Sequence, residues 1–383
     1  MKVMLSATEV SGDMHGANLV HAIRKFSPDS VFFGLGGEKM KEAGVELKAF
    51  TTHLGTVGIA EGVRFYPLFF KLFFKAKKVL QEERPDVLVL IDSRDFNVNL
   101  INPARKLNIP VVYYVAPPIW AFPDTRMKKM VDKINKVIAF FPFEADSYRK
   151  IGADVALVGH PLVDLVKVEK KREEICRELR LDPSLPIISL LPGSRIHEVK
   201  NLLPLMLSAA ERLNHKLREV QYLLCVAASF LDEKIRSMLD KRNLRVRVVG
   251  KKVYEAMSVS DLVIASSGTA TLEATCLEVP MIILYRTHIL TYLLARMLIR
   301  VPYVGLPNLL AGEEIVPELL QFKLTEESLA EKVFELLETP EKREKIKNEL
   351  KKVKEKLGPP GAMERAARVV LEVAVSKKRR YAK

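Results

Sequence analysis

The chain has 383 residues, 48% of them hydrophobic and 28% charged, which predicts two domains and excludes an intrinsically disordered protein. The cysteines Cys176, Cys225 and Cys276 show no Cys-x-x-Cys spacing, which argues against a disulfide framework or a zinc site and favours a reducing cytosol. A net charge of +14 favours an anionic partner, such as a phosphorylated substrate or an acidic membrane face, although solubility alone would also explain it.

Apolar β-type runs alternate with helical patterns along the chain, which is typical of parallel sheets covered on both faces. In the first half we predict strands at 2–6, 31–34, 87–91, 111–115, 136–140 and 155–158. In the second half we predict strands at 187–191, 221–226, 246–249, 262–265 and 281–284. The expected fold class is therefore α/β, with two Rossmann-like domains whose parallel sheets face each other across a cleft. The expected domains are 1–165 and 166–359, and a helix within 360–383 is expected to pack back on the first domain.

Membrane-crossing segments and a signal peptide are not expected. The N-terminus lacks a basic region followed by an apolar stretch, and its first residues have the pattern of a strand. The best candidate for a transmembrane helix, 282–301, is interrupted by Arg286, His288, Arg296 and Arg300.

The first predicted strand runs into a turn and helix with the sequence SATEVSGDMHGANLV. Small and polar residues at such a junction suit contact with a sugar or a phosphate. The candidate cleft and acceptor-binding residues are Glu9, Ser11, Asp13, His15 and Asn18. Because Gly-Asp turns are common, an ordinary structural turn remains an alternative.

A helix predicted at 64–80 carries two kinds of apolar residue. One stripe suits the core: Phe65, Leu68, Phe69, Leu72, Phe73, Ala76, Val79 and Leu80. Phe70 and Phe74 lie off this stripe, among Lys71, Lys75, Lys77 and Lys78. Exposed phenylalanines surrounded by lysines suit an anionic lipid surface, and the basic tail 377–380 would add attraction. The alternative is a helix packed on both faces.

The buried strand at 87–91 leads to two carboxylates, Asp92 and Asp95. At the mouth of a cleft, Asp95 is placed to accept a proton from a hydroxyl nucleophile. The alternative is that Asp92 caps the turn and Asp95 is only solvated. The later loop YYVAPPIWAF contains Trp120, which fits either a core position or a sugar-stacking surface.

Two strand-turn-helix junctions in the second half are typical of phosphate binding. The strand at 187–191 leads to Pro-Gly-Ser-Arg, where Ser194 and Arg195 precede a helix, and the strand at 262–265 leads to a Ser-Ser-Gly-Thr turn. In the second junction, Ser267, Gly268 and Thr269 would form a phosphate cradle. Glu273 would accept the hydroxyls of a ribose, although it also suits the charge of a helix N-terminus. Together these junctions predict a nucleotide diphosphate donor.

Taken together, the motifs resemble lipid-A-disaccharide synthases, which are bacterial glycosyltransferases of the GT-B architecture. The resemblance covers nearly the whole chain and rests on SGDMHGAN, GLGG, IDSRDFN, YYVAPPIWAF, FFPFE, VGHPL, LLPGSR, EVKNLLP, SGTATLEA and VPYVGLPNLLAGEEIVPELLQ. It implies transfer of an acylated glucosamine from its UDP ester onto an acylated glucosamine 1-phosphate. The implied product is a β(1→6) disaccharide. No cofactor, metal or nucleic acid is implied, and the enzyme is expected in the cytoplasm, peripherally bound to the inner membrane, as a possible homo-oligomer.

Carried over residue by residue, the resemblance places the catalytic aspartate on Asp95 and the diphosphate-side arginine on Arg195. It also implies UDP-sugar contacts for Glu273 and for Asn308 of the Leu-Pro-Asn run. The chain departs from the family pattern at Thr8, at 93–94 and at 122, where Thr, Ser-Arg and Phe replace Gly, Ala-Pro and Trp.

Two other functions remain open. Another GT-B enzyme acting on UDP-sugars, such as a UDP-GlcNAc epimerase, would need no lipid contact and would form no glycosidic bond. A non-catalytic binder of RNA or membranes would also be basic, although the chain has neither a zinc-finger spacing nor an RNP-type aromatic motif.

Overall fold

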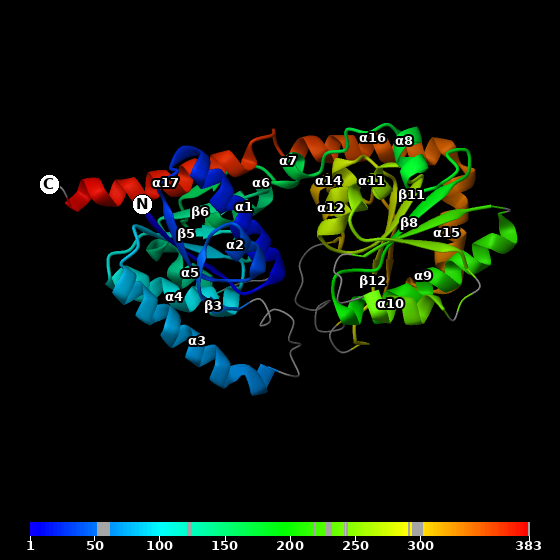
Figure 1. The fold of residues 1–383 in the computed structure, drawn as a ribbon. Helices are drawn as coiled ribbons and strands as arrows, with labels where there is room; N and C mark the ends of the chain where they lie inside the picture. The colour runs from blue at the N-terminus through cyan, green and yellow to red at the C-terminus, as the bar shows by residue number, and fades with distance from the viewer. Residues whose placement is uncertain are drawn as a thin grey trace. The chain divides into compact units, whose positions relative to one another are not determined.

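The chain divides into two compact units, whose elements are labelled in Figure 1. The computed structural model describes residues 1–51, 62–120, 125–217, 219–226, 232–240, 242, 244–289, 292 and 302–381. Unit 1 comprises Met1–Pro161 and Gly358–Lys383, and unit 2 comprises Leu162–Leu357. Each boundary lies a few residues before the one we predicted. Position 122, one of the departures from the family pattern, lies outside the described residues.

Unit 1 contains a parallel sheet of seven strands in the order β3-β2-β1-β4-β5-β6-β7. The strands are β1 Lys2–Ala7, β2 Val31–Gly36, β3 Glu46–Phe50, β4 Val87–Ile91, β5 Val111–Tyr114, β6 Lys136–Ala139 and β7 Val155–Leu157. The helices are α1 Val10–Phe26, α2 Glu38–Glu42, α3 Gly62–Glu83, α4 Arg94–Lys106, α5 Thr125–Met130, η3 Val131–Lys133, α6 Pro142–Lys150 and α17 Ala362–Tyr381.

Unit 2 contains a parallel sheet of six strands in the order β10-β9-β8-β11-β12-β13. The strands are β8 Ile187–Leu191, β9 Gln221–Cys225, β10 Val246–Val249, β11 Leu262–Ser266, β12 Met281–Tyr285 and β13 Glu318–Leu320. The helices are α7 Leu162–Leu165, α8 Arg172–Glu178, α9 Ile196–Lys216, α10 Asp232–Leu239, α11 Val253–Ser258, α12 Thr269–Cys276, α14 Leu306–Ala311, η5 Gln321–Lys323, α15 Glu326–Glu338 and α16 Pro340–Lys356.

The central strands are continuous apolar runs because helices cover both faces of each sheet. Every residue of β4, β8 and β11 is buried, as expected for the inner strands of parallel α/β sheets. The structure therefore confirms the predicted α/β class with two Rossmann-like domains.

The order of the strands reverses direction at one point in each sheet. In unit 1 the chain moves outward from β1 through β2 to β3 and then returns to β4 on the other side of β1. In unit 2 the same reversal separates β8 from β11. Ligands of doubly wound sheets bind beyond the carboxyl ends of the strands at this switch point. The predicted site motifs follow these four strands, β1, β4, β8 and β11.

The C-terminal helix α17 belongs to unit 1, where it lies against α1 (Figure 1). Lys25 of α1 forms an ion pair with Glu364 at 2.7 Å. The Arg365 guanidinium donates hydrogen bonds to the Val158 carbonyl at 2.7 and 2.8 Å. These bonds fasten the returning chain to the end of β7.

In the parts of the chain that the structure describes, every helix falls short of the length and hydrophobicity that a transmembrane span requires. The candidate run at 282–301 extends beyond the described residues.

Candidate active site

The turn between β8 and α9 is occupied by a carboxylate of the protein itself. Glu198 Oε2 accepts the backbone N–H groups of Ser194 at 3.0 Å and Arg195 at 3.3 Å. Glu198 Oε1 lies 3.6 Å from an Arg195 guanidinium nitrogen, and the side chain of Arg195 is 56% exposed. The sequence predicts phosphate binding at this turn. In the structure a capping carboxylate holds two of its N–H groups, and Arg195 presents its exposed side chain.

The turn between β11 and α12 is open. Gly268 and Thr269 are exposed, and a methyl group added at Gly268 would meet no atom within 4 Å. Ser267 is held below them, because its hydroxyl donates to the Val304 carbonyl at 3.0 Å and its N–H donates to the Leu284 carbonyl at 2.9 Å. An exposed helix N-terminus at a switch point suits an anionic ligand.

Glu273 lies one turn into α12 and faces a tyrosine. Its Oε1 accepts a hydrogen bond from the Tyr254 hydroxyl at 3.2 Å. Burial raises the pKa of Glu273, whereas the bond from Tyr254 opposes that rise. The other carboxylate oxygen leaves capacity for a ligand hydroxyl.

Asn308 is fully buried and its hydrogen-bonding capacity is used within the protein. Its side-chain amide donates to the Val316 carbonyl and to Glu318 Oε1, both at 2.8 Å. Its oxygen accepts the N–H groups of Ile315 at 2.9 Å and Val316 at 3.0 Å. The sequence led us to expect a substrate contact, but in this structure Asn308 fastens a loop.

That loop is coupled to the open turn through Glu318, which the sequence analysis missed. Glu318 also accepts the N–H groups of Val304 at 3.0 Å and Gly305 at 2.9 Å. The Val304 carbonyl in turn accepts the hydrogen bond from the Ser267 hydroxyl. Glu318 therefore links Asn308 to the β11–α12 turn through its bonds to Asn308 and to Val304.

In unit 1, Asp95 lies in the first turn of α4, directly beyond β4. Its side chain is 75% exposed and lies 3.6 Å from the Arg94 guanidinium. An exposed carboxylate beyond the carboxyl end of a central strand is available to a hydroxyl of a substrate.

The Asp13 side chain is enclosed by the protein rather than open to solvent. It is buried, and its carboxylate accepts the N–H groups of Gly37 at 2.7 Å, Lys39 at 2.9 Å and Met40 at 3.1 Å. Asp13 therefore caps α2, and this corrects the prediction that it lies at a cleft mouth. Of the other residues predicted there, Ser11 is exposed, and Glu9 and Asn18 are half-buried.

His15 belongs to an aromatic cluster near the carboxyl ends of β5 and β6. Its ring lies 6.2 Å from Tyr114 and 5.7 Å from Phe140, and the Phe140 ring lies 5.2 Å from His160. His15 Nδ1 is buried without a hydrogen-bond partner among the described residues. Burial lowers the pKa of His15 to about 4. Burial, together with the charge of His15, lowers the pKa of His160 to about 3.

Helix α3 shows the two predicted kinds of apolar residue. Leu72, Ala76, Val79 and Leu80 are buried, whereas Phe70 is 52% exposed and Phe74 is 61% exposed. The neighbouring cations Lys71, Lys75, Lys77 and Lys78 are exposed. Trp120 is half-buried, with its ring edge-to-face against Phe143 at 5.0 Å.

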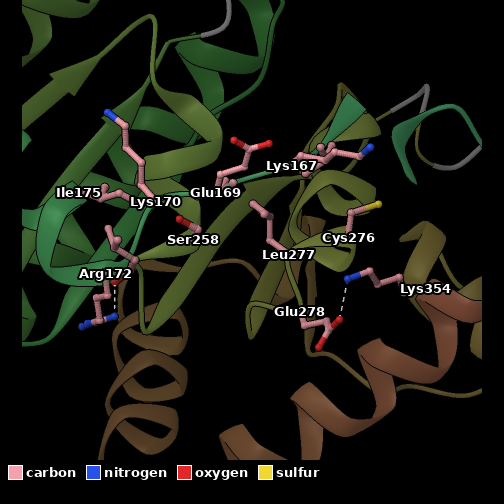
Figure 2. Close-up of a pocket in the computed structure, with 13 residues that line it drawn as sticks. Lys167, Glu169, Lys170, Arg172, Ile175, Ser258, Cys276, Leu277, Glu278 and Lys354 are labelled. Atoms are coloured by element: carbon pink, nitrogen blue, oxygen red, sulfur yellow. Dashed lines mark hydrogen bonds and ion pairs between the residues drawn. The ribbon is translucent and has the colours of Figure 1, made fainter. Parts of the chain in front are cut away.

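The cavity in Figure 2 lies elsewhere in unit 2. It is lined by the segment that enters the unit, including Lys167, and by Ser258, Leu277 and Glu278. Because Ser258 precedes β11 and Glu278 precedes β12, the cavity lies toward the amino ends of the strands. Lys354 is paired with Glu278 at 2.6 Å (Figure 2). The cavity is therefore separate from the turns that carry the motifs.

Comparison with known proteins identifies the family. The model of the lipid-A-disaccharide synthetase family matches residues 3–373. The lipid-A-disaccharide synthase of Geobacter metallireducens is 39% identical over 378 residues, covering 99% of this chain and 98% of that relative. The enzyme of the same name from Syntrophus aciditrophicus is 39% identical over 370 residues, covering 96% and 97%.

Solved structures agree on the fold. The crystal structure of the UDP-GlcNAc 2-epimerase from Neisseria meningitidis bound to UDP-GlcNAc superposes with a TM-score of 0.68 at 13% identity, covering 98% of this chain and 100% of that one. At this identity the likeness shows the two-domain architecture alone. The sequence relatives decide the family: the chain belongs to the lipid-A-disaccharide synthetases and is a glycosyltransferase of lipid A biosynthesis.

Proposed function

We propose that the enzyme joins UDP-2,3-diacylglucosamine to 2,3-diacylglucosamine 1-phosphate, giving the β(1→6) disaccharide 1-phosphate and UDP. The observation that carries this proposal is the position of the four strand-turn-helix motifs, which follow β1, β4, β8 and β11, the strands at the two switch points. This is where doubly wound domains bind their ligands. The neighbouring epimerase of the same fold, crystallised with UDP-GlcNAc, supports a UDP-sugar as donor.

Unit 2 would hold the donor. The exposed residues Gly268 and Thr269 would offer their N–H groups to the diphosphate, and the Arg195 guanidinium would add a charge-assisted contact. Ser194 lies beside Arg195 on the neighbouring turn, and Glu273 would accept ribose hydroxyls. Asn308 would act indirectly, by holding the loop behind Ser267.

Unit 1 would supply the acceptor site and the base. The 6-hydroxyl oxygen of the acceptor attacks the anomeric carbon of the donor as the bond from that carbon to the diphosphate oxygen breaks. The leaving electron pair stays on UDP, and the hydroxyl proton passes to the Asp95 carboxylate. A single displacement inverts the anomeric configuration, so an α-linked donor gives a β-linked product.

The departing diphosphate would be stabilised by Arg195 and by the amide groups at the α12 N-terminus, in the place of a metal ion. No cofactor is required by this step.

Helix α3 would hold the enzyme at the cytoplasmic face of the inner membrane. The exposed rings of Phe70 and Phe74 each offer roughly 1.5–3 kcal/mol on full burial. Each nearby lysine adds about 1 kcal/mol at an acidic leaflet. Both proposed substrates carry acyl chains, so a membrane-bound enzyme would meet them where they reside.

Mass spectrometry of the products from the two acylated substrates tests the reaction. We expect the mass of the disaccharide 1-phosphate together with free UDP, and we expect Asp95→Asn to lower kcat at least 100-fold with donor binding retained. A separate incubation with UDP-GlcNAc alone, followed by NMR because an epimer has the same mass, would support the epimerase alternative if it yielded the epimer. Near-normal turnover by Asp95→Asn would remove Asp95 from the mechanism.

A further inference from the structure

The turn that carries Asp95 is fastened to β1 by a buried asparagine, Asn97. Its side-chain oxygen accepts a hydrogen bond from the Ser6 hydroxyl at 2.7 Å. Its nitrogen donates to the carbonyls of Ser6 at 3.1 Å and of Ile91 and Asp92 at 2.9 Å each. Ser6 and Asn97 are both fully buried. One side chain of α4 therefore joins the carboxyl ends of β1 and β4, the two strands at the switch point.

A second fastening lies nearer the surface. The hydroxyl of Thr8, just beyond β1, is hydrogen-bonded to the hydroxyl of Ser93, just before α4. Thr8 is buried. Ser93 N–H also donates to the Asp92 carboxylate at 2.7 Å. The end of β1 therefore contacts the turn before α4 twice. Ser6 is bonded to Asn97, and Thr8 is bonded to Ser93.

The backbone of the turn at 92–93 is in the left-handed conformation, which residues other than glycine rarely adopt. Asp92 has φ of 53° and Ser93 has φ of 54°, and the facing residue Val115 has φ of 56°. Left-handed backbone is unfavourable for L-residues and most unfavourable for a β-branched one. Asp92 N–H donates to the Val115 carbonyl at 3.0 Å, and Tyr113 hydroxyl donates to the Asp92 carbonyl at 3.0 Å. Strained backbone at a site persists only where its surroundings hold it.

Asp95 itself is not held in this way. Its side chain is 75% exposed and forms an ion pair with the adjacent Arg94. The direction in which its carboxylate points therefore depends on the first turn of α4, which the Ser93 backbone begins.

We infer that Asn97 and the Thr8–Ser93 pair are positioning residues for the transfer step, which set the proposed base Asp95 toward the acceptor hydroxyl. The inference rests on the proposed function. Because a small misplacement of a catalytic group lowers the rate of the chemical step rather than the binding of the donor, loss of either fastening reduces kcat and leaves the donor KM unchanged.

The test compares Thr8→Val with a matched control, Thr51→Val. Thr51 is also fully buried, and its hydroxyl donates to the Ala7 carbonyl at 2.6 Å, so the control removes a hydroxyl bond from the same end of β1 without touching the Asp95 turn. We expect Thr8→Val to lower kcat about tenfold, with donor KM and UDP affinity within about twofold of wild type. Thr8→Ser should restore kcat, and Thr51→Val should keep it.

A double variant shows whether the effect passes through Asp95. In the Asp95→Asn background, Thr8→Val should cause no further loss of kcat, because the base it positions is already absent. An undiminished tenfold loss in that background, or an equal loss in Thr51→Val, would overturn the inference. Asn97→Asp, which keeps the shape but replaces the donor by an acceptor facing three carbonyls, should show the same split between kcat and KM. Absence of disaccharide from the wild-type enzyme would instead reject the proposed function, and the inference with it.

Discussion

At the scale of single residues, the sequence motif did not reveal that Glu198 caps the N-terminus of α9. Its carboxylate lies at the N-terminus of α9, bonded to the N–H groups of Ser194 and Arg195. A diphosphate approaching Arg195 therefore meets a negative charge of the protein. The two anions compete for the same guanidinium and the same helix dipole.

Glu198→Gln should consequently bind UDP more tightly, by about threefold to tenfold, because removal of one nearby charge is worth about 0.5–1.5 kcal/mol in a partly exposed site. The glutamine oxygen still accepts the two backbone N–H groups, so the cap is kept. Isothermal titration calorimetry with UDP measures the change. Glu198→Ala is the control for the cap, and it should lose about 1 kcal/mol of stability. Weaker UDP binding by Glu198→Gln would show that the carboxylate supports the donor site instead.

The sequence only partly predicted which polar residues of a motif are exposed and therefore available to a ligand. Arg195, Thr269 and Asp95 are exposed as expected. Asp13 and Asn308 carry the same kind of side chain in equally distinctive runs, but each accepts backbone N–H groups of another segment, α2 for Asp13 and the residues 315–316 for Asn308. Local sequence does not reveal such partners, because they come from the packing of other elements.

At the scale of elements, the inner strands were predictable because burial on both faces produces continuous apolar runs. The strands β3 and β13 were missed. β3 reads Glu-Leu-Lys-Ala-Phe, a mixed pattern without a fully buried residue, and β13 has three residues. Both lie at the edge of a sheet, where one side lacks a neighbouring strand and polar residues are tolerated.

The exposed face of α3 leads to a prediction about membranes. Phe70→Ser combined with Phe74→Ser should lower binding to vesicles containing acidic phospholipid about tenfold or more, because two exposed rings no longer insert. A flotation assay measures the bound fraction. Phe322→Ser is the matched control, since Phe322 is 72% exposed but lies in unit 2. Equal binding by the α3 double variant and wild type would eliminate the membrane role of this helix.

The aromatic cluster of unit 1 predicts a pH dependence of stability. The folded-state pKa of His160 is lowered to about 3 from 6.5 by burial and by His15. A depressed pKa contributes stability that is complete above pH 6.5 and is lost as the pH falls toward 3. Glu144 acts in the opposite sense. Burial raises its pKa to about 7, so its contribution is present below about pH 4.5 and is lost as the pH rises through 7.

His160→Phe keeps the stacking with Phe141, whose ring lies 5.1 Å away, and removes one titration. Between pH 7.5 and 5, the variant should lose about 2 kcal/mol less stability than the wild type. Urea denaturation at the two pH values measures this difference. Glu144 is present in both proteins, so its contribution to the pH dependence cancels. Identical losses in the two proteins would show that His160 is charged without cost in the folded state.

At the scale of the whole molecule, the two units share one plan. Each is a parallel sheet with a single switch point, and in each the two strands beside that point lead into site motifs. The alternation of strands and helices in the sequence predicted the parallel sheets, whereas the order of the strands and the switch points came from the structure. The chain passes from one unit to the other after Pro161 and after Leu357, whereas the domains predicted from the sequence end at 165 and 359.

The proposed donor site also predicts a reaction without a metal ion, because a guanidinium and helix N–H groups would face the leaving group there. Activity should be unchanged, within about twofold, after incubation with EDTA and after addition of magnesium. The measurement is the initial rate of UDP release with both acylated substrates. Loss of the rate in EDTA and its return with magnesium would require a metal site.

The central claim concerns where the donor's diphosphate binds, and a crystal structure of the enzyme with UDP tests it most directly. We expect the phosphates against Arg195 and the 267–269 turn, with the ribose at Glu273. UDP bound instead in the cavity of Figure 2, at the opposite ends of the strands, or on unit 1 alone, would contradict the account.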